Sequence, residues 1–419
     1  MKKAVVTGMG AITPIGNNVE EFWANLIQGK SGAAPITKFD TTNHKTKFAC
    51  EIKGFDPLQF LDKQEIRKMD IYTQYAIAAA DECIKDSHLD IGTSDLDRIG
   101  VIIATGIGGM HTLEEDLLSF ADNNRIPRFS PYFITKILSN IASGHIAIRY
   151  GFHGINYSVT SACASSNNAI ANALDIIRLG RADIVIAGGS EATITQAAIG
   201  GFNSIKALST LNEYPEQASR PFDRNRDGFV AGEGSGVLMI EELDHAIQRG
   251  AHIYCELAGA GAASDAYHVT ATHPDGYGAI LAMKEALKDA GLTAEDVTYI
   301  NAHATSTQIG DISECKAIEK VFSEVLNKIQ ISATKSMTGH LLGAAGAIES
   351  IVCIKSIEQN IIPPTINLID PDPELNPQLN FTPLKACKKE VLVALNNTFG
   401  FGGHTSTTVY KKHYSNSEK

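Results

Sequence analysis

The sequence predicts an α/β fold, because short apolar segments alternate with longer amphipathic ones along most of its 419 residues. A weaker second observation is that parts of this alternation occur twice, in the same order. The chain also has 36 glycines, mostly in pairs and triplets, which is typical of tight turns and close backbone contacts. We therefore expect two similar α/β halves, residues 1–250 and 251–419, with a site between them.

The strands are predicted where β-branched and apolar residues form runs of four to six. They comprise residues 4–7, 99–104, 155–160, 184–187, 236–241, 299–302 and 391–396. The helices are predicted where apolar residues recur with helical spacing. They comprise residues 19–28, 71–87, 165–179, 279–290, 311–322 and 344–359.

Four pairs of segments make up the internal repeat. They are 6–12 with 257–263, 98–106 with 297–306, 160–165 with 334–340, and 236–243 with 390–397. Each match is poor by itself, and their shared order is what favours a duplication. The first pair contains Gly-X-Gly turns, but Thr13 and Ser264 replace the third glycine of a dinucleotide-binding fingerprint, so nucleotide binding is disfavoured.

Charge and cysteine content exclude several classes of protein. A net charge of −11 disfavours nucleic acid as the main partner, since phosphate binding needs a basic face. Seven cysteines, none of them in a CxxC pair, disfavour a disulfide framework and a zinc site, and we expect no metal. Neither a signal peptide nor a membrane span is predicted, so we expect a cytoplasmic protein with no membrane partner.

The sharpest chemical signal is Cys163, in the segment TSACASS at 160–166. A strand ends there in small residues and a helix follows, which places the cysteine at a helix N-terminus. Backbone N–H groups and the helix dipole favour a thiolate at such a position, and the small neighbours leave room for a thioester. The alternative is an inert buried cysteine, the commoner fate of this residue type.

Two histidines lie on turns at corresponding ends of predicted strands and helices. His303 belongs to NAHATST at 301–307, and His340 belongs to TKSMTGHLLGAAG at 334–346. Any single histidine is more often a surface or core residue, but these two occur where the other turn residues are small. A glycine-rich turn, FGFGGH at 399–404, has the flexibility to present backbone N–H groups to an oxyanion.

In combination these motifs resemble the elongating β-ketoacyl-(acyl-carrier-protein) synthases of the thiolase-like superfamily. The resemblance runs nearly from end to end, through VTGMG at 6–10, SRPFD at 219–223, RDGFV at 226–230 and FGFGG at 399–403. It implies a duplicated five-layer α/β/α/β/α body and a homodimer. It also implies a decarboxylating condensation of an acyl-enzyme with malonyl-carrier protein, as in fatty acid elongation.

The resemblance assigns the chemical roles. Cys163 would carry the acyl group, while His303 and His340, as uncharged imidazoles, would stabilise the enolate formed as CO₂ leaves. The N–H groups of Cys163 and Phe401 would form a second oxyanion hole, and the Phe401 ring matches a gate. Lys335 matches a residue beside the histidines, for which an ordinary ion pair is the alternative.

Binding residues are assigned in the same way. Those that would bind substrate are Thr270, Thr305 and Thr307 on the phosphopantetheine arm, Ile107 in the acyl pocket, and Glu349 behind the histidines. An acidic acyl carrier protein is the expected partner, docking on Arg67, Lys68 and Lys206, although a solvated surface accounts equally for each cation. No cofactor is expected, because the substrates arrive on the carrier's phosphopantetheine.

Some positions depart from the family pattern. Gln308 stands where proline is common, Leu211 where arginine is common and Thr405 where asparagine is common, and 134–136 lacks a usual proline. These changes leave open a ketosynthase of specialised metabolism that makes polyene or polyketide-type chains. A non-catalytic chain-length-factor-like partner is a third alternative, which Cys163 disfavours. A thiolase is disfavoured because His404 and Thr405 occupy the place of its second cysteine.

Overall fold

The computed structural model describes residues 1–414. Ten of its strands form one sheet in the order β10-β9-β13-β14-β8-β1-β7-β6-β4-β5. In chain order these strands are β1 (Ala4–Ile12), β4 (Ile99–Ala104), β5 (Asn156–Tyr157), β6 (Ile184–Glu191), β7 (Gly234–Glu242), β8 (Cys255–Ser264), β9 (Tyr299–Asn301), β10 (Gln330–Ser332), β13 (Val393–Gly400) and β14 (His404–Lys411).

The strand order repeats on the two sides of the sheet. Five strands lie before residue 250 and five after it. Counted from the outer edge of the sheet toward its centre, each set has its third strand first, followed by its second, fourth, fifth and first. The two sets join where β1 and β8 pair antiparallel, with Ala4 opposite Leu257. This topology is that of a duplicated α/β body, and the placing of a domain boundary at residue 250 stays a prediction.

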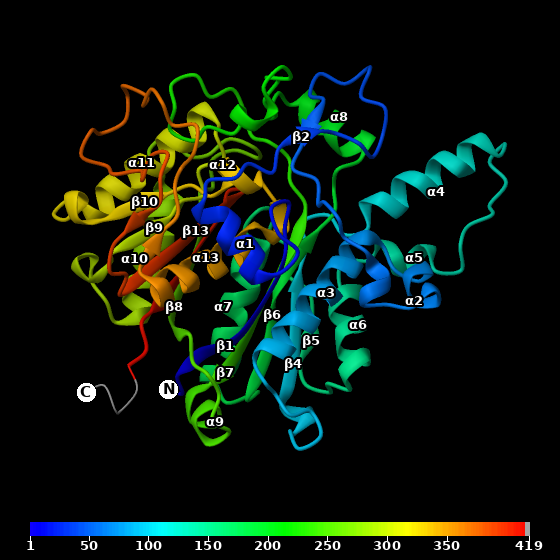
Figure 1. The fold of residues 1–419 in the computed structure, drawn as a ribbon, viewed down its shortest axis with the longest axis horizontal. Helices are drawn as coiled ribbons and strands as arrows, with labels where there is room; N and C mark the ends of the chain where they lie inside the picture. The colour runs from blue at the N-terminus through cyan, green and yellow to red at the C-terminus, as the bar shows by residue number, and fades with distance from the viewer. Residues whose placement is uncertain (415–419) are drawn as a thin grey trace.

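Four helices build the layers around the sheet. Helix α3 (Ile71–Asp86) packs on β1 and β7, and α10 (Tyr277–Ala290) packs on β8 and β14. Between them lie α7 (Ser165–Arg178) and α13 (Ala345–Gln359), which contact each other and strands from both sides of the sheet. Since α7 touches both β4 and β14, which are far apart in the strand order, the sheet wraps around the central pair (Figure 1).

The burial of these elements explains their composition. Helix α13 is buried from Ala345 to Ile354 and again at Ser356 and Ile357, and an almost entirely covered helix belongs at the centre of a fold. Strands β1, β6 and β7 are buried along their whole lengths, as expected of strands with helices on both faces.

The remaining elements lie at the edges of these layers or in the connections. The helices are α1 (Val19–Ile27), α2 (Lys63–Arg67), α4 (Met110–Asp122), α5 (Phe133–Ile137), α6 (Ile141–Tyr150), α8 (Gln196–Ser204), α9 (Leu243–Gln248), α11 (Gln308–Phe322) and α12 (Lys335–Thr338). The short strands pair as β2 (Ala34–Pro35) with β3 (Phe48–Ala49) and as β11 (Ile361–Ile362) with β12 (Cys387–Lys388). Helix α4 projects from the body on the right of Figure 1.

All six predicted helices are present, and the largest difference is at α11, which begins at Gln308 instead of residue 311. The predicted strand at 155–160 is too long, because only Asn156–Tyr157 pairs before the chain turns toward Cys163. Strands β8, β10 and β14 were not predicted. Strand β14 is rich in threonine and serine, yet it is buried from Thr405 to Tyr410. Its threonine hydroxyls can be buried there because they find partners on Gly278, Asn397 and Asn167.

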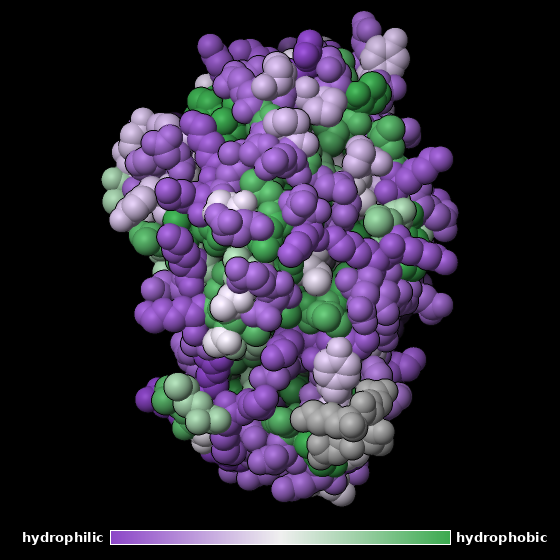
Figure 2. Space-filling model, turned by 90° about the vertical axis from the view of Figure 1, so that its left-hand side faces the viewer, coloured by the Kyte–Doolittle hydropathy of each residue, from purple (hydrophilic) through white to green (hydrophobic). Residues whose placement is uncertain are grey.

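Two observations describe the surface. Figure 2 shows that the side carrying α10 and α11 is covered mainly by hydrophilic residues, with hydrophobic ones interspersed. Across residues 1–414, no helix combines the length and the apolar character needed to cross a membrane.

Candidate active site

Cys163 lies on a strained elbow between β5 and α7. The preceding residue, Ala162, has a positive φ of 51°, which a residue with a side chain rarely adopts. Ser165 holds the elbow, because its hydroxyl accepts a hydrogen bond from Ser161 N–H at 2.8 Å and donates one to Ala162 O at 2.6 Å. The sulfur is thereby placed beside the start of α7, and the residue is 9% exposed.

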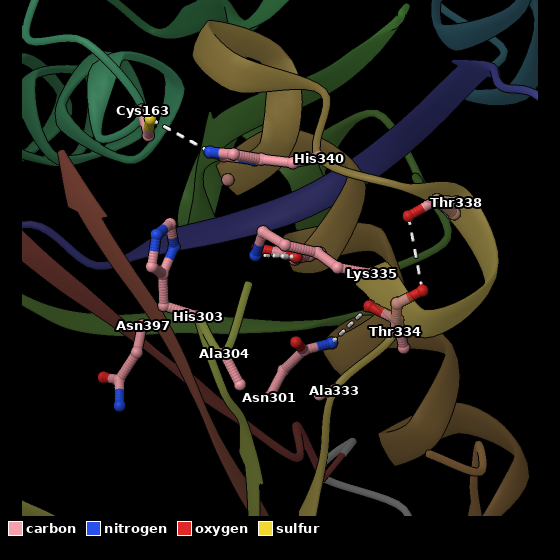
Figure 3. Close-up of polar contacts among 12 residues, drawn as sticks. Cys163, Asn301, His303, Ala304, Ala333, Thr334, Lys335, Thr338, His340 and Asn397 are labelled. Atoms are coloured by element: carbon pink, nitrogen blue, oxygen red, sulfur yellow. Dashed lines mark hydrogen bonds and ion pairs between the residues drawn. The ribbon is translucent and has the colours of Figure 1, made fainter. Parts of the chain in front are cut away.

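Two histidines converge on this cysteine from the other end of the chain. His340, which follows α12, places Nε2 3.0 Å from Cys163 Sγ. His303, which follows β9, lies edge-to-face with His340 at 5.3 Å between ring centres (Figure 3). Its backbone is fixed by the Glu314 carboxylate, which accepts hydrogen bonds from the N–H groups of His303 and Ala304. The structure therefore brings together the three residues that the sequence singled out.

Both imidazoles are uncharged at neutral pH. Burial is the main cause that holds the pKa values of His303 and His340 well below 6.5, and the positive charge of Lys335 lowers both further. The prediction of two neutral imidazoles is confirmed. Rings in this state can donate a hydrogen bond to an oxygen whose negative charge is growing.

The prediction of a resting thiolate is wrong. Burial raises the pKa of Cys163 to about 12, and this effect outweighs the lowering by Lys335 and by the backbone N–H groups of Phe401 and Cys163 itself. The helix start is too weak to ionise a thiol that has so little contact with water. Cys163 therefore rests as a thiol, with the Nε2 of His340 placed to accept its proton.

Lys335 and Glu349 form an ion pair behind the two rings. Both side chains are almost fully buried, and Lys335 Nζ bonds Glu349 Oε1. Burial raises the pKa of Glu349 to about 7 despite the opposing effect of Lys335. Glu349 does not line the cavity beside Cys163, so its assignment to substrate binding is wrong: its carboxylate contacts the lysine instead.

The glycine-rich turn is the tip of the β13–β14 hairpin. Gly402 and Gly403 have φ values of 86° and 77°, a conformation that favours glycine. Gly400 lies so close to the elbow that an added Cβ would be 2.9 Å from Cys163 N. This approach brings the N–H of Phe401 to the sulfur, beside the N–H of Cys163. Both N–H groups lie near enough to the sulfur to lower its pKa, which is the neighbourhood where an oxyanion hole would be needed.

A cavity of about 400 Å³ opens beside the cysteine. Its lining includes Cys163, both histidines and five other residues assigned from the sequence: Ile107, Thr270, Thr305, Thr307 and Phe401. It also includes residues that the sequence analysis did not assign to the site, among them Phe202, Ile205, Phe229, Asp265 and Ile309. Phe229 packs edge-to-face on His340 at 5.4 Å, and its place in the RDGFV motif was the signal that could have revealed it.

The predicted docking cations lie outside the cavity. Arg67 ends α2 and is exposed, Lys68 follows it, and exposed Lys206 follows Ile205, which lines the cavity. No cluster of His, Cys, Asp or Glu suited to a metal ion occurs in the part of the chain that the structure describes.

Comparisons with known proteins identify the family. The N-terminal domain model of beta-ketoacyl synthases matches residues 1–246, and the C-terminal domain model matches residues 254–369. The chain belongs to the beta-ketoacyl synthase family. It is 47% identical to a 3-oxoacyl-(acyl-carrier-protein) synthase 2 of Synechocystis over 98% of both chains, and 46% identical to one of Staphylococcus aureus over 98% of both.

Solved ketosynthases share the fold. The ketosynthase in the AntDE:AntF complex, bound to its type II PKS acyl-carrier protein, is 35% identical with a TM-score of 0.91, and the ishigamide ketosynthase/chain length factor is 34% identical with a TM-score of 0.92. Each match covers 99% of this chain and 100% of the other. The predicted family and thiolase-like α/β fold are confirmed, and the protein is a ketosynthase, an acyltransferase.

The residues that depart from the family pattern do not line the cavity of this ketosynthase. Gln308 begins α11, and its carbonyl accepts a hydrogen bond from Arg226. Thr405 is buried and its hydroxyl donates to Gly278 O at 3.0 Å. Leu211 is half-buried, and Ile134 on α5 is 59% exposed. None of these residues contributes a group to the Cys163–His340 contact.

Proposed function

We propose that this ketosynthase condenses a Cys163-bound acyl group with malonyl-carrier protein, releasing CO₂ and a 3-oxoacyl-carrier protein two carbons longer, as in fatty acid elongation. The observation that carries this proposal is the 3.0 Å contact between Cys163 Sγ and His340 Nε2, with a second neutral histidine beside it. The relatives named 3-oxoacyl-(acyl-carrier-protein) synthase 2 support it.

Acyl transfer comes first. The Cys163 thiol attacks the thioester carbonyl of the acyl-carrier protein while His340 takes its proton. The negative charge that develops on the carbonyl oxygen is held by the N–H groups of Cys163 and Phe401. The carbon–sulfur bond to the carrier then breaks, and the departing carrier thiol takes the proton back from His340, so the imidazole is neutral again.

Condensation follows on the same residues. The bond between the malonyl carboxylate and its α-carbon breaks, CO₂ leaves, and the electron pair forms an enolate on the thioester oxygen. His303 donates a hydrogen bond to this oxygen, and so does His340 in the tautomer that carries its proton on Nε2. The α-carbon then attacks the acyl-Cys163 carbonyl, a new carbon–carbon bond forms, and Cys163 leaves as a thiolate that regains a proton from solvent or an imidazole.

The other assigned residues set the charge of the histidines or bind the substrate. The buried Lys335–Glu349 pair keeps a positive charge near both rings, which favours their neutral form. Hydroxyls of Thr270, Thr305 and Thr307 on the cavity wall suit the neutral amides of a phosphopantetheine arm, and Ile107 suits an acyl chain. The proposed steps need no resident cofactor, since the carrier supplies the arm.

The proposed partner is an acidic acyl carrier protein. Lys206 is an exposed cation one residue from Ile205, which lines the cavity, and it is therefore placed to meet a carrier whose arm enters there. Arg67 and Lys68 at the end of α2 offer a second basic site. An acyl-carrier protein bound to the ketosynthase of the AntDE:AntF complex supports this partner.

We further propose a homodimer through the face formed by α4, α5 and β5. Large apolar side chains are exposed there: Leu117, Leu118, Ile126, Phe129, Ile134 and Leu138. Strand β5 ends the sheet, so one of its edges is open to pairing. Sedimentation of the wild type should give a dimer, Ile134→Glu should give a monomer, and Ile247→Glu on α9 should leave the dimer intact. A monomeric wild type would contradict this proposal.

The test of the function is a product profile. Purified protein is incubated with malonyl-carrier protein and a panel of saturated acyl-carrier primers, and products are identified by mass spectrometry. A single two-carbon extension of saturated primers supports fatty acid elongation. Repeated extension of one primer without reduction would instead indicate a polyketide-type ketosynthase, and the absence of an acyl adduct on Cys163 would indicate a non-catalytic partner.

A further inference from the structure

Glu191 is a buried carboxylate next to the site that the proposed mechanism does not use. It ends β6, is 0% exposed, and no cation pairs with it within residues 1–414. Burying an unpaired carboxylate is costly unless hydrogen bonds replace its water. Three neighbouring backbone N–H groups and the Thr105 hydroxyl supply these bonds.

Four donors from two separate segments meet on its two oxygens. Oε1 accepts from the Thr105 hydroxyl at 3.0 Å and from Ile107 N–H at 3.3 Å. Oε2 accepts from Gly106 N–H at 2.7 Å and from Gly343 N–H at 2.9 Å. Because all four groups donate, both atoms at the end of the side chain must accept hydrogen bonds. A carboxylate has two acceptor oxygens, whereas an amide has only one.

The segments that contain Gly106 and Gly343 lie so close together that both positions favour glycine. A Cβ added to Gly343 would lie 2.2 Å from Gly106 N and 2.7 Å from Glu191 Oε2, and one added to Gly106 would lie 2.8 Å from the same oxygen. The backbone contact excludes any side chain at Gly343, and a side chain at Gly106 would push the Glu191 carboxylate out of its place. The carboxylate and the two glycines therefore form one unit that joins the end of β4 to the turn after His340.

Both segments belong to the wall of the catalytic cavity. Gly106 and Ile107 line it on one side, and Leu342, adjacent to Gly343, lines it next to His340. We propose that Glu191 is a positioning residue, which sets the place of His340 relative to Cys163 and to the acyl-binding wall at Ile107. This inference rests on the proposed function for its kinetic readout.

The test compares the condensation rates of Glu191→Gln and the wild type. Each rate is divided by the amount of protein whose Cys163 reacts with iodoacetamide. An amide has one acceptor oxygen, so its N–H₂ group would oppose either the N–H groups of Gly106 and Gly343 or the N–H of Ile107, and the link between the two segments would loosen. We expect kcat to fall roughly 10²-fold, the scale of a misplacement of about 1 Å, and KM for malonyl-carrier protein to stay within about twofold. The preference among primer lengths should change, because the backbone of Ile107 is released.

Glu241→Gln is the matched control. Glu241 is equally buried but belongs to the neighbouring strand β7. It lies opposite Ile184, at the other end of the β6–β7 pair from Glu191, and its carboxylate bonds Arg249. A purely structural role for Glu191 predicts that both variants lose thermal stability while kcat per labelled site and primer preference stay at wild-type values. That result would overturn the proposal.

Alkylation keeps the inference testable without turnover. If His340 is displaced, the rate of iodoacetamide reaction at Cys163 should fall at least threefold in Glu191→Gln. An unchanged rate, or a rise caused by removal of a negative charge near the thiol, would overturn the proposal. A wild type that alkylates but forms no product would instead contradict the proposed function.

A second variant covers the case in which Glu191→Gln does not fold. Thr105→Val removes one donor and should show the same changes to a smaller degree, whereas Thr105→Ser keeps the hydroxyl and should be unaffected.

Discussion

His340 Nε2 lies 3.0 Å from Cys163 Sγ, although the two residues are 177 positions apart in the chain. The thiol is neutral because burial raises its pKa, and the imidazole is neutral because burial lowers its own. A neutral thiol against a neutral ring avoids two buried charges at rest. The pair becomes polar only when the thiol attacks a carbonyl and passes its proton to the ring.

Replacing the nucleophile should separate the two chemical steps. In Cys163→Gln the side chain can no longer be acylated, so we expect condensation to fall below detection. Decarboxylation of malonyl-carrier protein should continue, because both histidines remain. Measurement of ¹⁴CO₂ release and of 3-oxoacyl product in the same reactions tests this, and retained condensation would refute the assignment of Cys163.

Removing one imidazole should affect decarboxylation. In His303→Ala the enolate loses a hydrogen-bond donor, and we expect CO₂ release to fall about 10²-fold or more, the usual effect of losing such a donor. His153→Ala, at an exposed position, is the control and should keep wild-type rates. Unchanged CO₂ release in His303→Ala would count against its role.

The pH dependence should report the neutral histidines. Their pKa values lie well below 6.5, so protonation should not reduce activity as pH falls from 8 to 6.5, and the loss should begin only below that. Removing both charges in Lys335→Met/Glu349→Gln takes away one cause of the lowering while burial remains. The acidic limb of the pH–rate profile should therefore move to higher pH, and an unmoved limb would show that Lys335 does not influence the rings.

The approach of the hairpin tip to the elbow should be sensitive to a single methyl group. In Gly400→Ala the new Cβ would contact Ser161 O at 2.8 Å and Cys163 N at 2.9 Å, displacing the N–H of Phe401. We expect kcat to drop about 10²-fold, since one oxyanion-hole donor is lost. Gly201→Ala, where an added Cβ meets nothing within 4 Å, should have no such effect in the same assay.

Charge reversal at the cavity mouth should weaken carrier binding only. Lys206→Glu should raise KM for malonyl-carrier protein about tenfold at low salt, with little change in kcat and little change for malonyl-coenzyme A. Lys288→Glu, on the exposed end of α10, is the control. An equal rise in KM for both malonyl thioesters would mean that Lys206 acts on the arm and not on the carrier.

The sequence by itself determined the family, the six helices that it predicted and the three residues that meet at the site, but it missed other helices such as α4 and α6. Periodicity was sufficient for amphipathic helices such as α1 and α7, and the combination of motifs around Cys163, His303 and His340 is specific to the family. It could not reveal β14, because a strand of threonines reads as polar until its burial and its hydroxyl partners are known.

Only the tertiary structure decided the electrostatics. A helix start predicted an ionised Cys163, but an electrostatic environment depends on all neighbours in space, and burial among residues from distant segments reversed the sign. The same holds for Glu349, which turned out to face Lys335 instead of the cavity, and for Glu191, whose four donors come from segments more than 200 positions apart in the chain. Local patterns specify which groups are available, whereas the packing of distant segments fixes their charge and their contacts.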